Sequence, residues 1–451
     1  MKRVRSQYQK FGSTSWMSSV ALFGGLLWGR ALSVQAQIDP PLALKYFDEA
    51  KQISERDGGR LWGVPLYGPM IFAESGSRQV VANQADHEGL LKKQGGVFVG
   101  TLPANVGLAN TSVKWAGVHW TMVVWPPPAD DARARSRLFA HELWHGVQDE
   151  LGFPAANPSN VHLDTRDGRY WLQLEWRALK AALESSGDAR KDAIADALLF
   201  RAFRWSLFKS ADLEERALEM NEGLANYTGV DVGEATSDDA RSRAVAILED
   251  QSGAKTFTRS FAYTSGPAYG VLLDEACPDW RKKLRVKDDL GELLGDAFSL
   301  PNSRERFSAV EVRARVYDNG SLRAAEDQRD QKRQGRMREY RRRFVEGPVL
   351  TIPLRQMNVD FDPLNWEPLD DIGTVYPTIR ISDEWGVLKV KNGALLSADW
   401  TWVRVTAPND LSARPMRGDG WTLELGDGWK IAMDKKEGCF VVTREKKGNS
   451  D

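Results

Sequence analysis

The sequence predicts an α+β protein in which a small N-terminal sheet precedes a helical region and an all-β domain follows. Up to residue 125, short apolar runs rich in β-branched and aromatic residues alternate with turn residues. From 131 to about 295, apolar residues recur with the period of a helix. From 348 to 447, short alternating runs return, separated by Gly, Asp and Asn. A chain of 451 residues is long enough for two or three domains with their own cores.

Residues 1–36 have the layout of a secretory signal peptide. MKRVRSQYQK carries four positive charges and no acid, and the 14-residue run WMSSVALFGGLLWG is too short for a comfortable membrane span. The segment ends in SVQA, so we expect cleavage after Ala36 and a secreted or periplasmic protein. An uncleaved N-terminal anchor is the alternative. No other apolar run approaches spanning length, so no membrane span is expected once the signal is removed.

The charge balance argues against a nucleic-acid partner. The first 36 residues hold five of the 61 Lys and Arg, which leaves 56 bases against 62 acids, a net charge of −6. Phosphate binding requires a basic surface. The two cysteines, Cys277 and Cys439, could form one disulfide in an exported protein or remain unpaired thiols. The sequence leaves the oligomeric state open.

The elements follow in order along the chain. A helix is expected from 40 to the glycine pair at 58–59, then a hairpin of GPMIFAE and RQVVANQ around the turn SGS, then the strands GVFVGTLP and GVHWTMVVWP. The triple proline at 126–128 ends the last strand, and Asp130 or Asp131 is placed to cap the next helix. Helices are predicted over 131–151, 167–185, 188–208, 211–228 and 267–276. We therefore expect a first domain over 37–300, a charged helical linker over 301–346, and a β-sandwich-like accessory domain over 347–451.

The stretch HELWH, residues 141–145, is the clearest chemical signal. Side chains four apart on a helix lie on one face, so His141 and His145 can both direct a ring nitrogen at one metal ion. Glu142 is rotated by about a third of a turn, where it can bond a water molecule without ligating the metal. This is the arrangement that zinc-assisted hydrolysis needs, with Glu142 as general base. Zn²⁺ is therefore the expected cofactor.

A catalytic zinc ion needs a third protein ligand and one open position. On the predicted helix 211–228, Glu222 lies nearly opposite an apolar stripe that runs from Leu213 to Tyr227, and it is the preferred candidate. The rival is Glu175, which projects from the middle of an apolar stripe in YWLQLEWRALKAAL. A buried carboxylate must be paired, protonated or bound to metal, so Glu175 is either a ligand or the partner of an arginine or of a ligand.

HELWH followed by NEGLAN, residues 221–226, resembles the gluzincin metallopeptidases, the clan of thermolysin and the neutral zinc aminopeptidases. The resemblance implies a zincin-like domain, with His141, His145 and Glu222 as metal ligands and Glu142 as general base. Asn226 stands where the thermolysin group has an aspartate that bonds a histidine ligand, and the asparagine could fill that role only as a neutral acceptor.

FAYTSGPAYG, residues 261–270, is similar to a segment of the aminopeptidases in which a tyrosine three residues before a glycine opens a helix. The resemblance implies Tyr263 as the phenol that supports the developing oxyanion, with Pro267 at a helix start and Tyr269 as the competing tyrosine. His119 lies on the strand that zincins place beside extended substrate, and a contact with substrate is conceivable there.

The chain departs from these families in two places. Glu222 follows His145 by 77 positions, which requires a helical insertion over 155–210, and the Gly-x-Met-Glu-Asn segment of the aminopeptidases is absent. No named family within the clan can therefore be assigned, and endo- and exopeptidase activities both stay open. The expected function is a zinc metallopeptidase acting on a peptide or protein substrate. The alternatives are a catalytically silent zinc-binding envelope protein whose β domain binds a partner, and a zinc hydrolase of non-peptide substrates.

Overall fold

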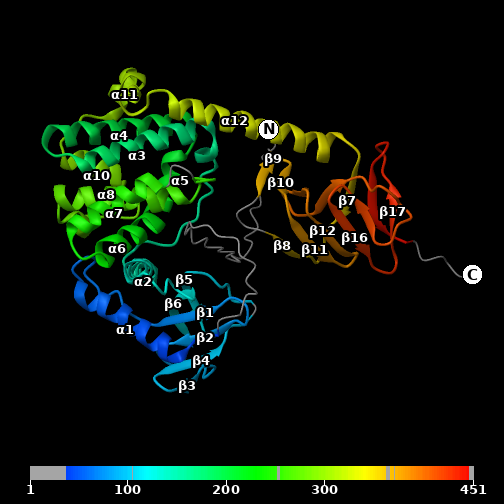
Figure 1. The fold of residues 1–451 in the computed structure, drawn as a ribbon, viewed down its shortest axis with the longest axis horizontal. Helices are drawn as coiled ribbons and strands as arrows, with labels where there is room; N and C mark the ends of the chain where they lie inside the picture. The colour runs from blue at the N-terminus through cyan, green and yellow to red at the C-terminus, as the bar shows by residue number, and fades with distance from the viewer. Residues whose placement is uncertain (1–36, 104, 251–253, 362–365, 370, 446–451) are drawn as a thin grey trace, which may run out of the picture. The chain divides into compact units, whose positions relative to one another are not determined.

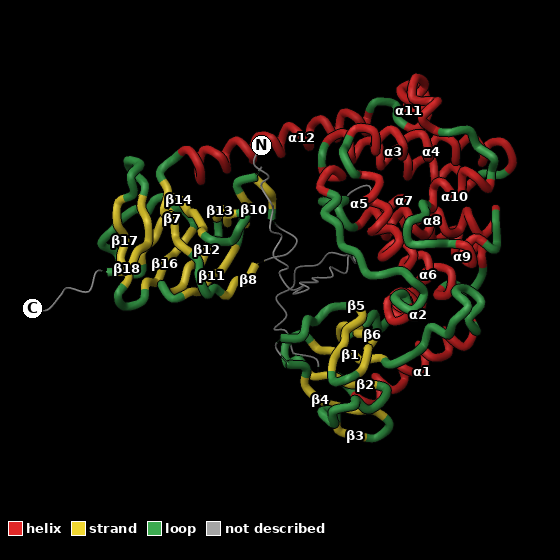
Figure 2. Tube along the Cα trace, turned by 180° about the vertical axis from the view of Figure 1, so that it is seen from behind, coloured by secondary structure: helices red, strands yellow, loops and turns green. Residues whose placement is uncertain are grey.

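The computed structural model describes residues 37–445 apart from 104, 251–253, 362–365 and 370. The expected signal peptide at 1–36 lies outside this range. The chain forms two compact units divided between Glu326 and Asp327. The first holds a sheet and a helical body and the second is built on strands, so the order of sheet, helices and β region is as predicted (Figures 1 and 2). Over the described residues, no helix is long and apolar enough to cross a membrane.

The first unit begins with α1 (Pro40–Asp57), which starts at a proline pair and ends at Gly58 in the left-handed conformation. A six-stranded sheet follows in the order β3-β4-β2-β1-β6-β5, in which only β1 and β6 pair in parallel. Its strands are β1 (Met70–Glu74), β2 (Gln79–Ala82), β3 (Lys92–Gln94), β4 (Val97–Thr101), β5 (Thr111–Trp115) and β6 (Val118–Trp125). The predicted hairpin is the β1–β2 pair, whereas the short strands β3 and β5 were not predicted.

The two faces of the sheet enter different cores. Phe72 and Trp125 face a large core shared with α1 and the helical body. Trp120 and Met122, which alternate with them along the strands, pack into a smaller core on the other face. The large core continues without a break into the helices, which fixes α2 (Ala132–Val147) directly on the sheet.

The helical body follows β6. Asp131 caps α2 by accepting a hydrogen bond from the Ala134 amide at 2.8 Å, as one of the two predicted capping residues. The remaining helices are α3 (Arg166–Glu184), α4 (Gly187–Leu207), α5 (Ala211–Leu218), α6 (Leu224–Gly233), α7 (Ser237–Asp250), α8 (Ser260–Ala276), α9 (Trp280–Lys283), α10 (Leu290–Ala297) and α11 (Val310–Tyr317), with a 3₁₀ turn η1 (Val161–Asp164), a second, η4 (Ser303–Ala309), and a π-turn η2 (Glu219–Gly223).

The range 301–346, expected as a linker, contributes to two cores. Val310, Ala314 and Leu322 are buried in the core of the first unit. The last helix, α12 (Ser321–Arg341), crosses the division and continues into a π-turn η5 (Arg342–Glu346). Phe344 of that turn is buried in a cluster of the second unit with Leu369 and neighbouring strand residues.

The second unit contains two antiparallel-rich sheets whose inner faces share one apolar core. One sheet has the order β17-β18-β7-β14-β13-β10-β9 and the other β15-β16-β12-β11-β8. The strands are β7 (Val349–Pro353), β8 (Asn358–Phe361), β9 (Glu367–Leu369), β10 (Gly373–Tyr376), β11 (Ile379–Asp383), β12 (Gly386–Val390), β13 (Ala394–Ser397), β14 (Trp402–Thr406), β15 (Met416–Gly418), β16 (Trp421–Leu425), β17 (Trp429–Met433) and β18 (Phe440–Arg444). Cys439 is buried in this unit and Cys277 belongs to the first, and both are free thiols.

Candidate metal centre

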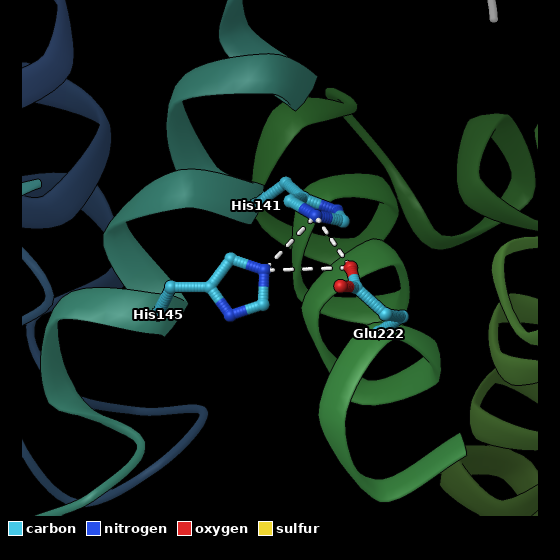
Figure 3. A group of neighbouring side chains, drawn as sticks. All are labelled: His141, His145 and Glu222. Carbon is cyan, nitrogen blue, oxygen red and sulfur yellow. Dashed lines mark hydrogen bonds and ion pairs between the residues drawn. The ribbon is translucent and has the colours of Figure 1, made fainter. Parts of the chain in front are cut away.

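Three of the predicted site residues meet inside the first unit. His141 and His145 come from α2, and Glu222 comes from the π-turn η2 between α5 and α6 (Figure 3). The two histidine Nε2 atoms are 3.2 Å apart, and each is 3.5 Å from Oε2 of Glu222. All three side chains are buried. These residues form the one group of three or more His, Cys, Asp or Glu side chains within metal-binding distance among the described residues.

These distances fit a zinc ion. The edge of a tetrahedron with metal–ligand bonds of about 2.1 Å is about 3.4 Å. The three observed separations lie close to that value. Oε2 of Glu222 is buried and has no hydrogen-bond partner within the described chain. A buried carboxylate oxygen directed at two imidazole nitrogens is the donor set that a zinc ion prefers.

The hydrogen bonds behind His145 favour metal binding through Nε2. His145 Nδ1 donates to Oε1 of Gln148 at 2.7 Å, and Nε2 of Gln148 donates to Oδ1 of Asn221 at 3.1 Å. Asn221 in turn donates to the carbonyl of Ala156 at 2.9 Å. Because Gln148 accepts the Nδ1 proton, the neutral form of His145 carries its lone pair on Nε2, on the side of Glu222.

The electrostatics of the group match its chemistry. Burial lowers the pKa of His145, but the Glu222 carboxylate outweighs burial and raises it to about 9. Burial raises the pKa of Glu222, but the two histidines 3.5 Å from its Oε2 hold it well below its usual range. An anionic Glu222 therefore faces two imidazoles, and a metal ion bound there would displace the proton that His145 holds in its absence.

Glu142 and Tyr263 lie at the edge of this group. Oε1 of Glu142 is 3.9 Å from Nε2 of His141, and its Oε2 is buried without a partner among the residues described. Burial raises the pKa of Glu142. The ring of Tyr263 stacks on His141 with centroids 5.5 Å apart and an angle of 9° between the planes. Burial and the charge of Glu222 raise the pKa of Tyr263 well above its ordinary value, so its phenol remains a proton donor.

The rival residues lie elsewhere. Glu175, the rival third ligand, is fully buried and accepts hydrogen bonds from Arg204 at 2.6 Å and from the hydroxyl of Tyr269, the competing tyrosine, at 2.7 Å. Glu175 and Tyr269 therefore belong to a buried polar network and not to the metal group. His162 is bonded to Glu215 at 2.8 Å. His119 lies on β6, where it pairs with Lys114 of β5, and β6 pairs with β1 only from Thr121 onward.

Two expectations about the surroundings are wrong. Asn226 does not contact a histidine; its Nδ2 donates to the Tyr263 carbonyl at 2.5 Å. Pro267 does not start a helix, because α8 already begins at Ser260. The two corrections have one cause. Proline lacks an N–H, so Pro267 leaves the carbonyl four residues earlier without its helical partner, and Asn226 supplies the missing donor.

Sequence reasoning also missed two polar neighbours of the ligands. Gln148 lies one turn after His145 on the same helical segment, and this spacing alone could have identified it. Arg259 Nη2 donates to Oε1 of Glu222 at 2.9 Å, and its Nη1 bonds Asn157. No local pattern links Arg259 to Glu222, because 37 residues separate them.

Glycines allow the ligand-bearing helices to approach closely. A Cβ on Gly229 of α6 would lie 2.8 Å from the Arg137 carbonyl of α2, one turn before His141. A Cβ on Gly266 of α8 would lie 2.3 Å from the carbonyl oxygen of Gly223, the residue after Glu222. The distance between α8 and the π-turn is therefore set by the absence of a side chain.

Gly266→Ala should destabilise the protein and disturb the metal group. The new methyl group meets backbone that cannot swing aside, so we expect the free energy of unfolding to fall by about 1–3 kcal/mol. Gly335→Ala in α12 is the matched control, because nothing lies within 4 Å of its added Cβ. Thermal unfolding of the metal-free variants measures both effects. A Gly266→Ala protein as stable as the Gly335→Ala protein would contradict this close packing.

No family model, curated protein or solved structure matches the chain.

Proposed function

We propose that this protein is a zinc-dependent hydrolase of the gluzincin kind, most simply a peptidase that cleaves peptide or protein substrates. The observation that carries the proposal is the convergence of His141 Nε2, His145 Nε2 and Glu222 Oε2 at separations of 3.2 and 3.5 Å. A carboxylate that could act as a base, Glu142, lies beside them. A purely structural zinc site is closed by four ligands and has no use for a base.

Each residue has a distinct role in the proposed reaction. His141, His145 and Glu222 would hold the zinc ion. Zinc bound there would acidify a water molecule and polarise a substrate carbonyl. Glu142, with a free buried oxygen, would accept the proton of the attacking water and deliver it to the leaving amine. Tyr263, stacked on His141, would donate a hydrogen bond to the oxyanion that develops on the substrate.

The surroundings support this division of roles. Gln148 orients His145, and Arg259 occupies the second oxygen of Glu222, which leaves Oε2 available as the single donor to the metal. The same proposal includes a zincin-like fold for the first unit and export of the protein. The β unit would be an accessory module that orients substrate or anchors the enzyme.

Metal removal tests the proposal. The purified protein should contain about one zinc per chain and should hydrolyse unfolded casein. A chelator should abolish hydrolysis, and added zinc should restore it. Zinc at about 100 times its dissociation constant should also stabilise the fold by about 2.7 kcal/mol, measured as a shift in thermal unfolding. A protein that binds no divalent metal would contradict the proposal. Bound zinc without turnover of casein or of ester and amide substrates would favour the silent zinc-binding alternative.

A further inference from the structure

The turn that carries Glu222 is not α-helical. Residues Glu219–Gly223 form a π-turn in which the Leu224 amide bonds to the Glu219 carbonyl, five residues earlier. A π-turn inserted into a helix is rare and commonly marks a functional site. It rotates the following side chains away from the positions that an α-helix would give them. The direction of Glu222 therefore depends on what keeps this turn in place.

Glu219, the first residue of the turn, is held by a buried arginine. Arg201 of α4 donates through Nη1 to Oε1 of Glu219 at 2.9 Å, and through Nη2 to Oε2. Glu219 is fully buried and Arg201 is 2% exposed. A two-point contact between a guanidinium and a carboxylate fixes orientation as well as distance. The same residue thus closes the π-turn with its carbonyl and anchors it with its carboxylate.

The pair belongs to a larger buried network of charged side chains. Arg201 also contacts Asp289 at 2.7 Å and Glu175 at 3.3 Å, and Arg204 binds Glu175 and Glu215. Four buried carboxylates therefore surround two guanidinium groups. Buried ion pairs are a weak source of stability, because the cost of desolvating the charges offsets much of their attraction. A role in specifying local geometry accounts for its presence better than stability does.

We propose that Arg201 is a positioning residue that holds the π-turn, through Glu219, in the conformation that directs Glu222 at His141 and His145. The metal group is then arranged before the ion arrives. The inference rests on the proposed function only in requiring that the site bind a divalent metal. It also gives α4, which belongs to the long segment between His145 and Glu222, a role in arranging the metal group.

The test compares two isosteric changes at the same guanidinium. Glu219→Gln and Asp289→Asn each replace one fully buried acceptor of Arg201, but only Glu219 belongs to the π-turn. Zn²⁺ affinity is measured by competition with a chelator, and the Co²⁺ form is examined by visible absorption. Both are done at pH 8, since burial raises the pKa of Glu219 to about 7 even though Arg201 opposes the shift. Unfolding of the metal-free proteins reports any general loss of stability.

Glu219→Gln should weaken metal binding by about 10- to 100-fold, the range for groups that orient ligands, and should alter the Co²⁺ spectrum. Asp289→Asn should leave both unchanged. Arg201→Lys, which keeps the charge but not the two-point contact, should weaken binding in the same direction if Glu219→Gln does not fold. Wild-type affinity in Glu219→Gln, or an equal loss in Asp289→Asn, would overturn the inference. A wild type without metal affinity would instead overturn the proposed function.

Discussion

Glu142→Gln should leave zinc bound and lower the rate of hydrolysis by about 10²- to 10⁴-fold, the contribution expected of a general base. The amide has the size of the carboxylate but cannot accept a proton from water. Glu142 is 3% exposed and its Oε2 has no hydrogen-bond partner in the described part of the chain, so little else depends on its charge. The two histidines, which precede and follow it in sequence, should keep their positions.

The measurement combines zinc analysis with initial rates on casein for the zinc-loaded proteins. Glu150→Gln is the matched control, because it removes an exposed carboxylate just beyond the same helix and should retain the wild-type rate. Unchanged turnover in Glu142→Gln would remove the proposed base from the mechanism. Loss of zinc in this variant would mean that Glu142 supports the metal instead of the reaction.

Glu222→Gln should lose most of its zinc. Changes behind the ligands weaken metal binding by about 10- to 100-fold, so loss of an anionic ligand itself should exceed about 100-fold. The neutral amide oxygen is a weaker donor, and it removes the negative charge that the two histidines face at 3.5 Å. Zinc per chain after dialysis should therefore fall from about one to near zero, and hydrolysis should fall with it.

Glu175→Gln is the decisive comparison, because Glu175 was the rival third ligand. Its carboxylate is bonded by Arg201, Arg204 and Tyr269, so its replacement should leave the zinc content unchanged. Circular dichroism checks that both variants are folded. Retention of zinc by Glu222→Gln together with its loss in Glu175→Gln would transfer the ligand role to Glu175.

Much of the fold was predictable because it depends on local patterns. Helices α1 to α4, the first hairpin and seven of the C-terminal strands follow from periodic apolar residues and turn signals. Three of the strands that were missed, β3, β9 and β15, have three residues each, too few to show an alternating pattern. They are strands only because longer neighbours offer them backbone hydrogen bonds.

A second limit of sequence-based prediction appears in the helical-wheel projection of the helix expected over 211–228. It assumed a constant rotation per residue and placed Leu213 on the buried stripe, but Leu213 is 59% exposed. The π-turn at Glu219–Gly223 interrupts the regular rotation, so positions before and after it do not share one projection. The structure nevertheless places Glu222 beside His141 and His145, and its candidacy had rested on the motif of residues 221–223 and on the resemblance as well as on the projection.

The sequence by itself determined that His141 and His145 share one face of α2 with Glu142 next to them. This was possible because four-residue spacing on a helix is a local geometric relation. The tertiary structure alone decided between Glu222 and Glu175 as the glutamate that meets the two histidines, and it alone brought Arg201 to Glu219. These contacts join residues from separate helices, and glycine crossings at Gly229 and Gly266 bring those helices together. Distance between segments far apart in the chain is set by packing, and no periodicity within either segment encodes it.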